Sequence, residues 1–301
     1  MAIRNIVKIK SGSWIFEAFD VSLPKINTTV IEGKASPASL DEVTRIFAGK
    51  KSVEFSFSTY LKKLGSEGSL EPISDLIKAT GFKLTEEDTD ADSTNDTFIY
   101  TPADVSDAIT TPDFEILIGD NYYMSILDCA VKSLKLDFKA GEPVVATFDV
   151  VGVFGSESMS GSVTGNYDIK DPFVSKSLTL GSAVPSNFNA FELTIENTVA
   201  ERVDPSSNNV ITGFIITKRK IEASIDPELA TLYNVEDILN PFTITAGSAN
   251  DSVKIEGPNV VVTDRELGDR EGLVTSPLKL KFLPSNPGSN DSITITFKKV
   301  E

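Results

Sequence analysis

Apolar and polar residues alternate along most of this chain, and a period of two restricts it to a mainly β fold. The run VEFSFSTYL at 53–61 shows the pattern, as do SLKLDF at 133–138 and FELTIEN at 191–197. Successive side chains of a strand point to opposite faces of a sheet, so these runs predict strands with one buried and one polar face. The pattern predicts further strands at 114–119, 144–154, 210–218, 220–225, 278–282 and 292–298.

Two stretches have a helical pattern instead. The first covers residues 69–82, with apolar residues at 73, 76 and 77 and a glycine stop at 81. The second covers residues 226–242, with apolar residues at 232, 235, 238 and 239 before a proline at 241. This spacing places the apolar side chains on one helical face, so we expect one short helix in each half of the chain.

The two halves carry similar features in the same order. GKKSVEFSFST at 49–59 matches TKRKIEASID at 217–226, which aligns Glu54 with Glu222. The two helical stretches come next, and the closing strands at 134–138 and 144–148 align with 278–282 and 293–297. Alternating strands resemble one another for generic reasons, but three blocks in one order favour an internal duplication. The stretch around 155–172 is rich in Gly and Ser, so we expect domains at 1–156 and 172–301 joined by a linker at 157–171.

Composition narrows the function. The chain has 301 residues, no histidine, and a single cysteine, Cys129, which is expected to be a buried apolar residue. Histidine-dependent catalysis, a thiolate zinc site and an intrachain disulfide are therefore excluded. No serine-nucleophile or phosphate-binding motif occurs, so we expect no enzyme and no cofactor; a hydrolase that uses carboxylates alone is an alternative.

The net charge of −16 argues against a protein that reads nucleic acid, which needs a basic surface. Solubility alone explains an acidic surface, and so does a wall that DNA must pass without sticking. No leader-like segment and no stretch of roughly 20 apolar residues occurs, so we expect a soluble protein without a membrane span.

The most acidic run is TEEDTDADSTNDT at 85–97, which includes Glu86, Glu87, Asp88, Asp90 and Asp92. The three aspartates have the alternating spacing of a calcium loop, but Ser and Ile stand where such a loop needs Gly and a bidentate Glu. We therefore expect no metal and interpret the run as a solvated loop, or in a ring-forming protein as a loop that faces a channel or an adjacent ring.

The order of these features resembles the tail tube proteins of long-tailed bacteriophages with non-contractile tails. The resemblance runs through most of the chain. It rests on GKKSVEFSFSTYLK at 49–62, EPISDLIKATGF at 71–82, AGEPVVATFDVVGVF at 140–154 and GFIITKRKIEASIDPEL at 213–229. It implies two tandem tail-tube-like β-sandwich or barrel domains, each with a short flanking helix, that assemble into stacked rings around a channel for DNA.

The resemblance also implies partners and a site. A ring of six tube domains would need three chains with pseudo-sixfold symmetry, whereas six chains per ring is the alternative. A tail terminator and a tail tip protein would bind the tube ends, and the protein would be made in the host cytoplasm and reside in the virion tail. The lumen is expected to be acidic, with Glu54 and Glu222 as the best-matched candidates to line it. An adhesin or carbohydrate-binding β-sandwich is the competing function, and the second domain could instead be an outward decoration.

Overall fold

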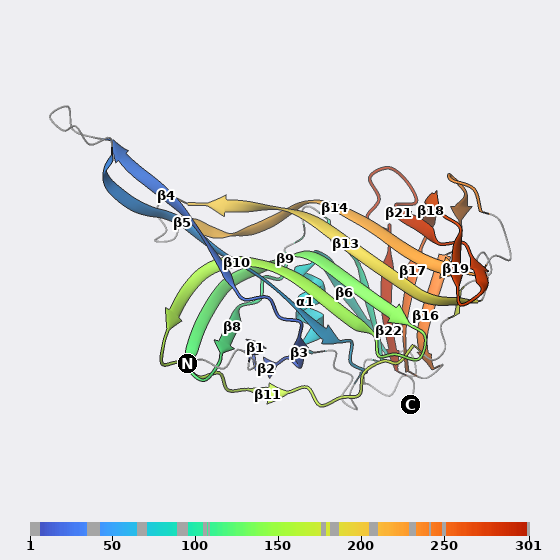
Figure 1. The fold of residues 1–301 in the computed structure, drawn as a ribbon, viewed down its shortest axis with the longest axis horizontal. Helices are drawn as coiled ribbons and strands as arrows, with labels where there is room; N and C mark the ends of the chain where they lie inside the picture. Colours follow the sequence, from blue (N-terminus) through green and yellow to red (C-terminus); the bar gives the residue numbers. More distant parts are fainter. Residues whose placement is uncertain are drawn as a thin grey trace.

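Long antiparallel strands build nearly the whole molecule (Figure 1). The computed structural model describes residues 7–34, 43–64, 71–88, 96–104, 107, 109–175, 179–180, 187–204, 210–228, 233–240, 242–248 and 251–299. Within these residues the fold is mainly β with one short helix, which confirms the predicted fold class at this level.

The larger of two main sheets has fourteen strands and runs through both halves of the chain. β9 (Tyr122–Lys139) is central: one edge pairs first with β8 and then with β13, and the other pairs with β10. Along the sheet the order is β4–β5–β10–β9–β13–β14–β21–β18–β15, with β8, β1, β2 and β11 continuing from β9 and β3 pairing with β5. The strands are β1 Val7–Ser11, β2 Trp14–Ile15, β3 Ala18–Phe19, β4 Lys25–Lys34, β5 Val43–Tyr60, β8 Phe114–Ile118, β10 Val145–Ser158, β11 Asn166–Tyr167, β13 Phe188–Val203, β14 Ile211–Pro227, β15 Ile238–Leu239, β18 Asn259–Arg265 and β21 Leu278–Leu283.

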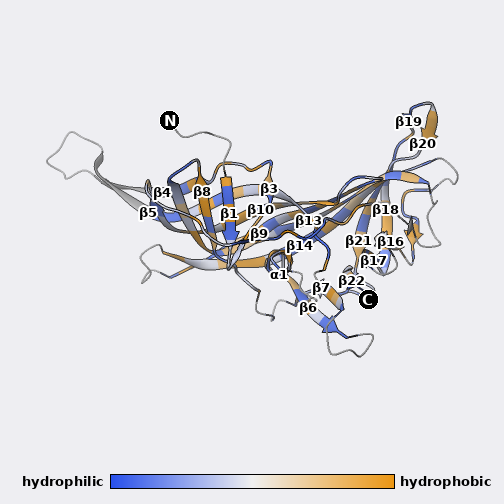
Figure 2. Ribbon diagram, turned by 90° about the horizontal axis from the view of Figure 1, so that it is seen from below, coloured by the Kyte–Doolittle hydropathy of each residue, from blue (hydrophilic) through white to orange (hydrophobic). Residues whose placement is uncertain are grey.

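The smaller main sheet has six strands in the order β12–β16–β17–β22–β7–β6. Its strands are β6 Phe82–Glu87, β7 Thr97–Pro102, β12 Thr179–Leu180, β16 Phe242–Ser248, β17 Asp251–Gly257 and β22 Thr294–Lys299. A separate hairpin, β19 (Gly268–Arg270) with β20 (Leu273–Thr275), stands out from the body in Figure 2.

The alternation in the sequence is realised as one continuous buried face of the large sheet. Phe57, Phe148, Leu134, Ile195 and Ile221 lie opposite one another from β5 to β14, and each is 4% exposed or less. They belong to a single hydrophobic core that contains residues of both halves and of both main sheets. Because burial of apolar area drives folding, this shared core couples the two halves.

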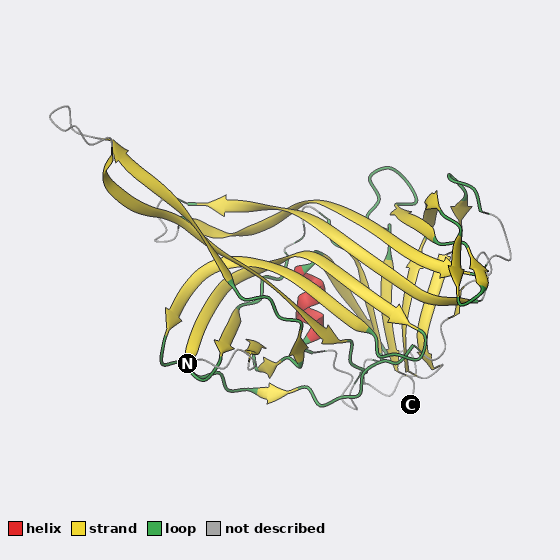
Figure 3. Cartoon of the chain, in the orientation of Figure 1, coloured by secondary structure: helices red, strands yellow, loops and turns green. Residues whose placement is uncertain are grey.

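The first predicted helix is confirmed as α1 (Ile73–Ala79), which lies beside β9 and β6 (Figure 3). Its apolar residues Ile73, Leu76 and Ile77 are buried, as the helical spacing requires. Gly81 has a φ of 86°, a conformation that only glycine adopts readily, and it follows the C-terminal end of the helix.

The second predicted helix is wrong over its described residues. Residues 226–227 end the strand β14, Glu228 forms an isolated bridge with Thr275, and residues 233–240 form a turn and the two-residue strand β15. Residues 229–232 and 241 lie outside the described residues. Leu239 is buried, but Val235 and Ile238 are exposed, so the predicted apolar face does not form. Ile238 and Leu239 pair with β18 instead, and this tertiary pairing outweighs the local preference for a helix.

The turn-forming sequences AGEP at 140–143 and PSNPGSN at 284–290 predict two hairpin connections, and the second prediction is wrong. The AGEP turn does connect the paired strands β9 and β10, with the Glu142 N–H donating to the Lys139 carbonyl over 3.0 Å. The segment 284–290, by contrast, crosses between sheets, because β21 belongs to the large sheet and β22 to the small one. By position, β10 therefore corresponds to β21, and not to β22, since each follows the long strand β5 or β14 in the sheet order.

The two halves meet in both main sheets. β9 pairs with β13 from Lys139–Ala190 to Ser133–Glu196, and β7 pairs with β22. The expected linker at 157–171 contains the last two residues of β10 and the strand β11, which pairs with β2. The division of the chain into two domains stays a prediction.

Polar contacts reinforce this junction at the end of α1. Asn197 of β13 donates its amide N–H groups to the carbonyls of Thr80 and Val131, and the donor–acceptor distance is 3.0 Å in each case. Arg219 of β14 donates to the Gly81 carbonyl and lies 5.0 Å above the Phe82 ring. Burial lowers the pKa of Arg219 to about 10, because desolvation disfavours the charged form.

We predict that Asn197→Ala lowers the free energy of unfolding by about 1–3 kcal/mol, because two backbone carbonyls lose their donor where the halves meet. Urea unfolding at low protein concentration measures it. The matched control is Asn187→Ala, which removes one exposed hydrogen bond to Glu228 and should change stability by less than about 0.5 kcal/mol. Equal losses in the two variants would contradict the predicted role of Asn197.

Candidate functional site

The polar face of the large sheet is the surface that the fold presents most extensively. We call it the open face, meaning the side of β5, β10, β9, β13, β14, β21 and β18 that is opposite the buried core residues. One row of it runs through Thr147, Lys135, Thr194, Glu222 and Lys281, which are register partners on five successive strands. Because the rows cross from the first half into the second, the open face is one continuous surface.

Acidic and basic side chains alternate on the open face. Among the described residues, seven carboxylates and seven lysines lie on it: Glu54, Asp137, Asp149, Glu192, Glu196, Glu222 and Asp264, with Lys132, Lys135, Lys139, Lys218, Lys220, Lys279 and Lys281. The face is thus nearly neutral, although the chain carries a net charge of −16.

Ion pairs engage most of these lysines. Lys135 lies 2.7 Å from Glu192, and Lys279 lies 2.7 Å from Asp264. In the first half Lys132 lies 3.3 Å from Glu54 and 3.9 Å from Asp149, while in the second Lys220 lies 2.8 Å from Glu222 and 3.9 Å from Glu196. Each of the last two lysines is therefore shared by two carboxylates, and Glu54 and Glu222 hold comparable positions.

The pKa values of two aspartates on the face shift in opposite directions. Partial burial raises the pKa of Asp149 above its ordinary value, with Glu54 adding to the shift and Lys132 opposing it. The hydrogen bond from Lys279 lowers the pKa of Asp264. In the folded protein, ionisation of Asp149 is thus less favourable than ionisation of Asp264.

An apolar patch interrupts the open face near Glu54. Val151, the register partner of Glu54, and Ala130 are covered by Ile211 and Phe214 from the end of the β13–β14 hairpin, and all four are buried. The sequence analysis missed this contact, because the alternating pattern identifies the faces of a strand but not which strand lies over them.

The structure separates the predicted site residues into two groups. Glu54 and Glu222 lie on the open face, whereas Glu86, Glu87 and Asp88 are exposed at the end of β6 in the small sheet. Asp90 and Asp92 lie outside the described residues. Over the described part of the chain, no three acidic or cysteine side chains come together as a metal site. Cys129 is buried, as expected, and burial raises the pKa of its thiol.

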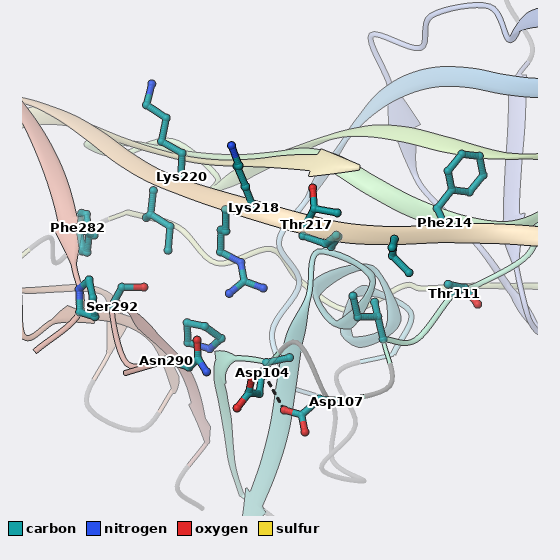
Figure 4. Close-up of a pocket in the computed structure, with 18 of the residues that line it drawn as sticks. Asp104, Asp107, Thr111, Phe214, Thr217, Lys218, Lys220, Phe282, Asn290 and Ser292 are labelled. Carbon is teal, nitrogen blue, oxygen red and sulfur yellow. Dashed lines mark hydrogen bonds between the residues drawn. The ribbon is translucent and has the colours of Figure 1, made fainter. Parts of the chain in front are cut away.

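A groove with a volume of about 1050 Å³ lies beside β14 (Figure 4). Its walls are β14, residues 102–104, 107, 109 and 111, and residues from the segment 281–292, and Figure 4 shows Asp104, Asp107 and Asn290 on the side of β14 opposite Lys218 and Lys220. Among the described residues, β14 pairs with β21 at 222–225. The groove follows the part of β14 before residue 222, which pairs with β13 along one edge and with no described strand along the other.

A two-layer β fold with one continuous, charge-balanced open face has the architecture of a structural protein whose sheet face and sheet edges are its working surfaces. The comparison with protein families agrees: the family described as phage tail tube protein matches residues 42–297. The chain therefore belongs to the phage tail tube protein family, a structural and typically non-enzymatic family of the virion tail. A comparison with curated proteins gives no match. Among the described residues, no helix is long and apolar enough to cross a membrane.

The opposite pKa shifts on the open face predict opposite effects of removing the two charges. Asp149 has a raised pKa when folded, so its charge costs stability at neutral pH, and Asp149→Asn should raise the free energy of unfolding there. Asp264 has a lowered pKa, so Asp264→Asn should reduce stability at neutral pH. Both differences should shrink in acid, as each wild-type carboxylate is protonated.

Urea unfolding of the two variants at neutral pH and in mild acid measures these effects, and each variant is the control of the other. Changes of the same sign at neutral pH would contradict the assignment.

Proposed function

We propose that this chain is the subunit of the tube of a non-contractile phage tail, that it assembles into stacked rings, and that its open face lines the channel through which DNA is ejected. The observation that carries this is the open face itself, a mainly polar surface that spans both halves and on which carboxylates engage most of the lysines. A lysine that already has a carboxylate partner attracts a passing phosphate less strongly, so DNA slides without a specific hold. Near-neutrality with paired cations, more than a strong acidic field, is the feature that makes this wall non-adhesive.

The order of strands supports a ring of three chains. The large sheet places β4–β5–β10–β9 of the first half beside β13–β14–β21–β18 of the second, each set beginning with a long hairpin. In each half a hairpin in the small sheet, β6–β7 or β16–β17, separates these strands in sequence. This common order supports the duplication into two tube domains and favours tube wall over outward decoration for the second.

The size of the channel discriminates between three and six chains. Eight strands per chain make twenty-four in a trimer, and a spacing of about 4.8 Å gives a barrel diameter of about 37 Å without tilt or about 48 Å with usual tilts. After side chains of about 6 Å on each wall, a channel of about 25–36 Å remains, which is wide enough for duplex DNA of roughly 20 Å. A hexamer would double the diameter to about 75–95 Å, far wider than its cargo.

Other parts of the chain would meet other partners. The described acidic residues of the run at 85–97 that were candidates, Glu86, Glu87 and Asp88, lie at the end of β6 in the small sheet, away from the open face, which favours contact with an adjacent ring over lining the channel. A tail terminator and a tail tip protein would close the two ends of the tube, and the subunit would be made in the host cytoplasm before it enters the virion.

The stoichiometry is directly testable. Purified protein should form hollow tubes by negative-stain imaging, and the native mass of isolated rings should equal three chains. Rings of six chains would contradict the trimer, and a stable monomer that binds glycans would contradict the tube.

The role of the open face predicts the effect of reversing its charge. In Glu54→Lys/Glu222→Lys, Lys132 and Lys220 lose their nearest carboxylates and two further cations are added. Tubes should still form, but retention of duplex DNA should increase, with a steep salt dependence, and ejection should slow by about an order of magnitude. Glu256→Lys breaks a similar 2.7 Å pair with Lys254 in the small sheet and is the matched control. If the double variant ejects DNA as the control does, Glu54 and Glu222 do not line the channel.

A further inference from the structure

A short segment covers the outer edge of β18, the last long strand of the large sheet. The Glu236 N–H donates to the Val262 carbonyl at a distance of 2.8 Å, and the Val262 N–H donates to the Asp237 carbonyl at a distance of 3.0 Å. Next to these bonds, Ile238 and Leu239 pair with Val261 and Val260. The segment Tyr233–Leu239, which we call the covering segment, thus occupies the backbone groups through which β18 could pair with another strand.

The covering segment is anchored at its two ends and is largely exposed between them. Tyr233 and Leu239 are buried, with exposed fractions of 9% and 3%, and Arg265 donates to the Tyr233 carbonyl at a distance of 2.9 Å, but the strand β15 has only two residues. Val235 and Ile238 are 55% and 62% exposed, although both are large and apolar. Glu236 has a φ of 78°, a left-handed conformation that costs a non-glycine residue energy. Exposed apolar groups and backbone strain both indicate a segment that is not in its most stable environment.

The local sequence favours another conformation. Val235, Ile238 and Leu239 have the spacing of one helical face, and the matching stretch of the first half forms α1 beneath the sheet. Conflict between local preference and observed structure is typical of elements with two alternative arrangements. In the first half, the corresponding long strand β9 has no such cover, because β13 pairs with that edge directly.

The pairing of β9 with β13 shows what a β18 edge without its cover could accept. β13 begins the second half, and by sheet order β4 begins the first, so a second copy would offer β4 to β18 as β13 is offered to β9. β4 pairs with β5 along one edge, and over the described residues no strand pairs with its other edge. The two ends of the large sheet are therefore complementary in kind.

We propose that the covering segment closes β18 in the free chain and leaves it when β4 of a second copy adds to that edge. This rests on the proposed tube function and specifies how ring formation is controlled. An open edge strand promotes uncontrolled association, so a displaceable cover keeps the free subunit from pairing before a ring or a growing tube displaces it.

A disulfide can hold the covering segment in place. Ile238 and Val261 are opposed across an antiparallel pair, a geometry that brings Cβ atoms within disulfide range, and the native Cys129 is 1% exposed and so cannot compete. Oxidised Ile238→Cys/Val261→Cys should form no tubes, and reduction should restore assembly. The control is Thr245→Cys/Lys254→Cys, an opposed pair within the small sheet, which should assemble equally well oxidised and reduced.

The outcomes separate this inference from the proposed function. If the oxidised Ile238–Val261 variant forms tubes as the reduced one does, the covering segment does not leave and the inference is wrong. If the wild-type chain forms no tubes, the proposed function fails instead.

A second variant decides the matter if the double-cysteine chain does not assemble in either state. Asp237→Ala removes the carboxylate that accepts the Asn234 N–H over 2.6 Å and so loosens the turn of the covering segment. It should shorten the lag before tube growth several-fold, whereas an unchanged lag would overturn the inference.

Discussion

The antiparallel pairing of β9 with β13 is the interaction on which the rest of this structure depends. It joins the strands of both halves into one sheet, and its register places Leu134 beside Ile195 on the buried side and Lys135 beside Thr194 on the other. Because side chains alternate along strands, a shift of one residue at this pairing would exchange core and open face across the second half. Asn197 and Arg219, which bind the end of α1 from β13 and β14, hold the same junction from beneath.

How much the sequence predicts follows from what a period of two encodes. It predicts which residues of a strand share a face, so the placement of Glu54 and Glu222 on polar positions and the burial of Phe57 and Ile221 could be read directly. It does not encode which strands become neighbours. For this reason β22 was assigned to a hairpin with β21, and the cover of Val151 by Phe214 was not predicted.

The two stretches predicted to be helical show that local preference alone does not determine the structure. The two helical stretches have comparable apolar spacing, yet α1 forms where its apolar face meets the core, and the second stretch forms a turn and a short strand on the edge of β18. Tertiary contact decides between them, because intrinsic helix preference amounts to a few tenths of a kcal/mol per residue. The acidic candidates separate for a similar reason. The sequence suggests both Glu54 and Glu86 as lumen or inter-ring residues, but Glu54 lies in β5 of the large sheet and Glu86 in β6 of the small sheet.

Net charge and open sheet edges have opposite effects on association between copies of this chain. Across the open face the acidic excess of the chain nearly disappears, so the excess must lie mainly on other surfaces, where it keeps free subunits apart by repulsion. Backbone pairing at the end strands of the large sheet favours association, because hydrogen bonds between strands are short-range and depend little on net charge. A subunit governed by both needs its edge closed until a partner is close enough for pairing to prevail over repulsion. The covering segment Tyr233–Leu239 meets that requirement, because its strand pairs with β18 over two residues and a longer strand can replace it at that edge.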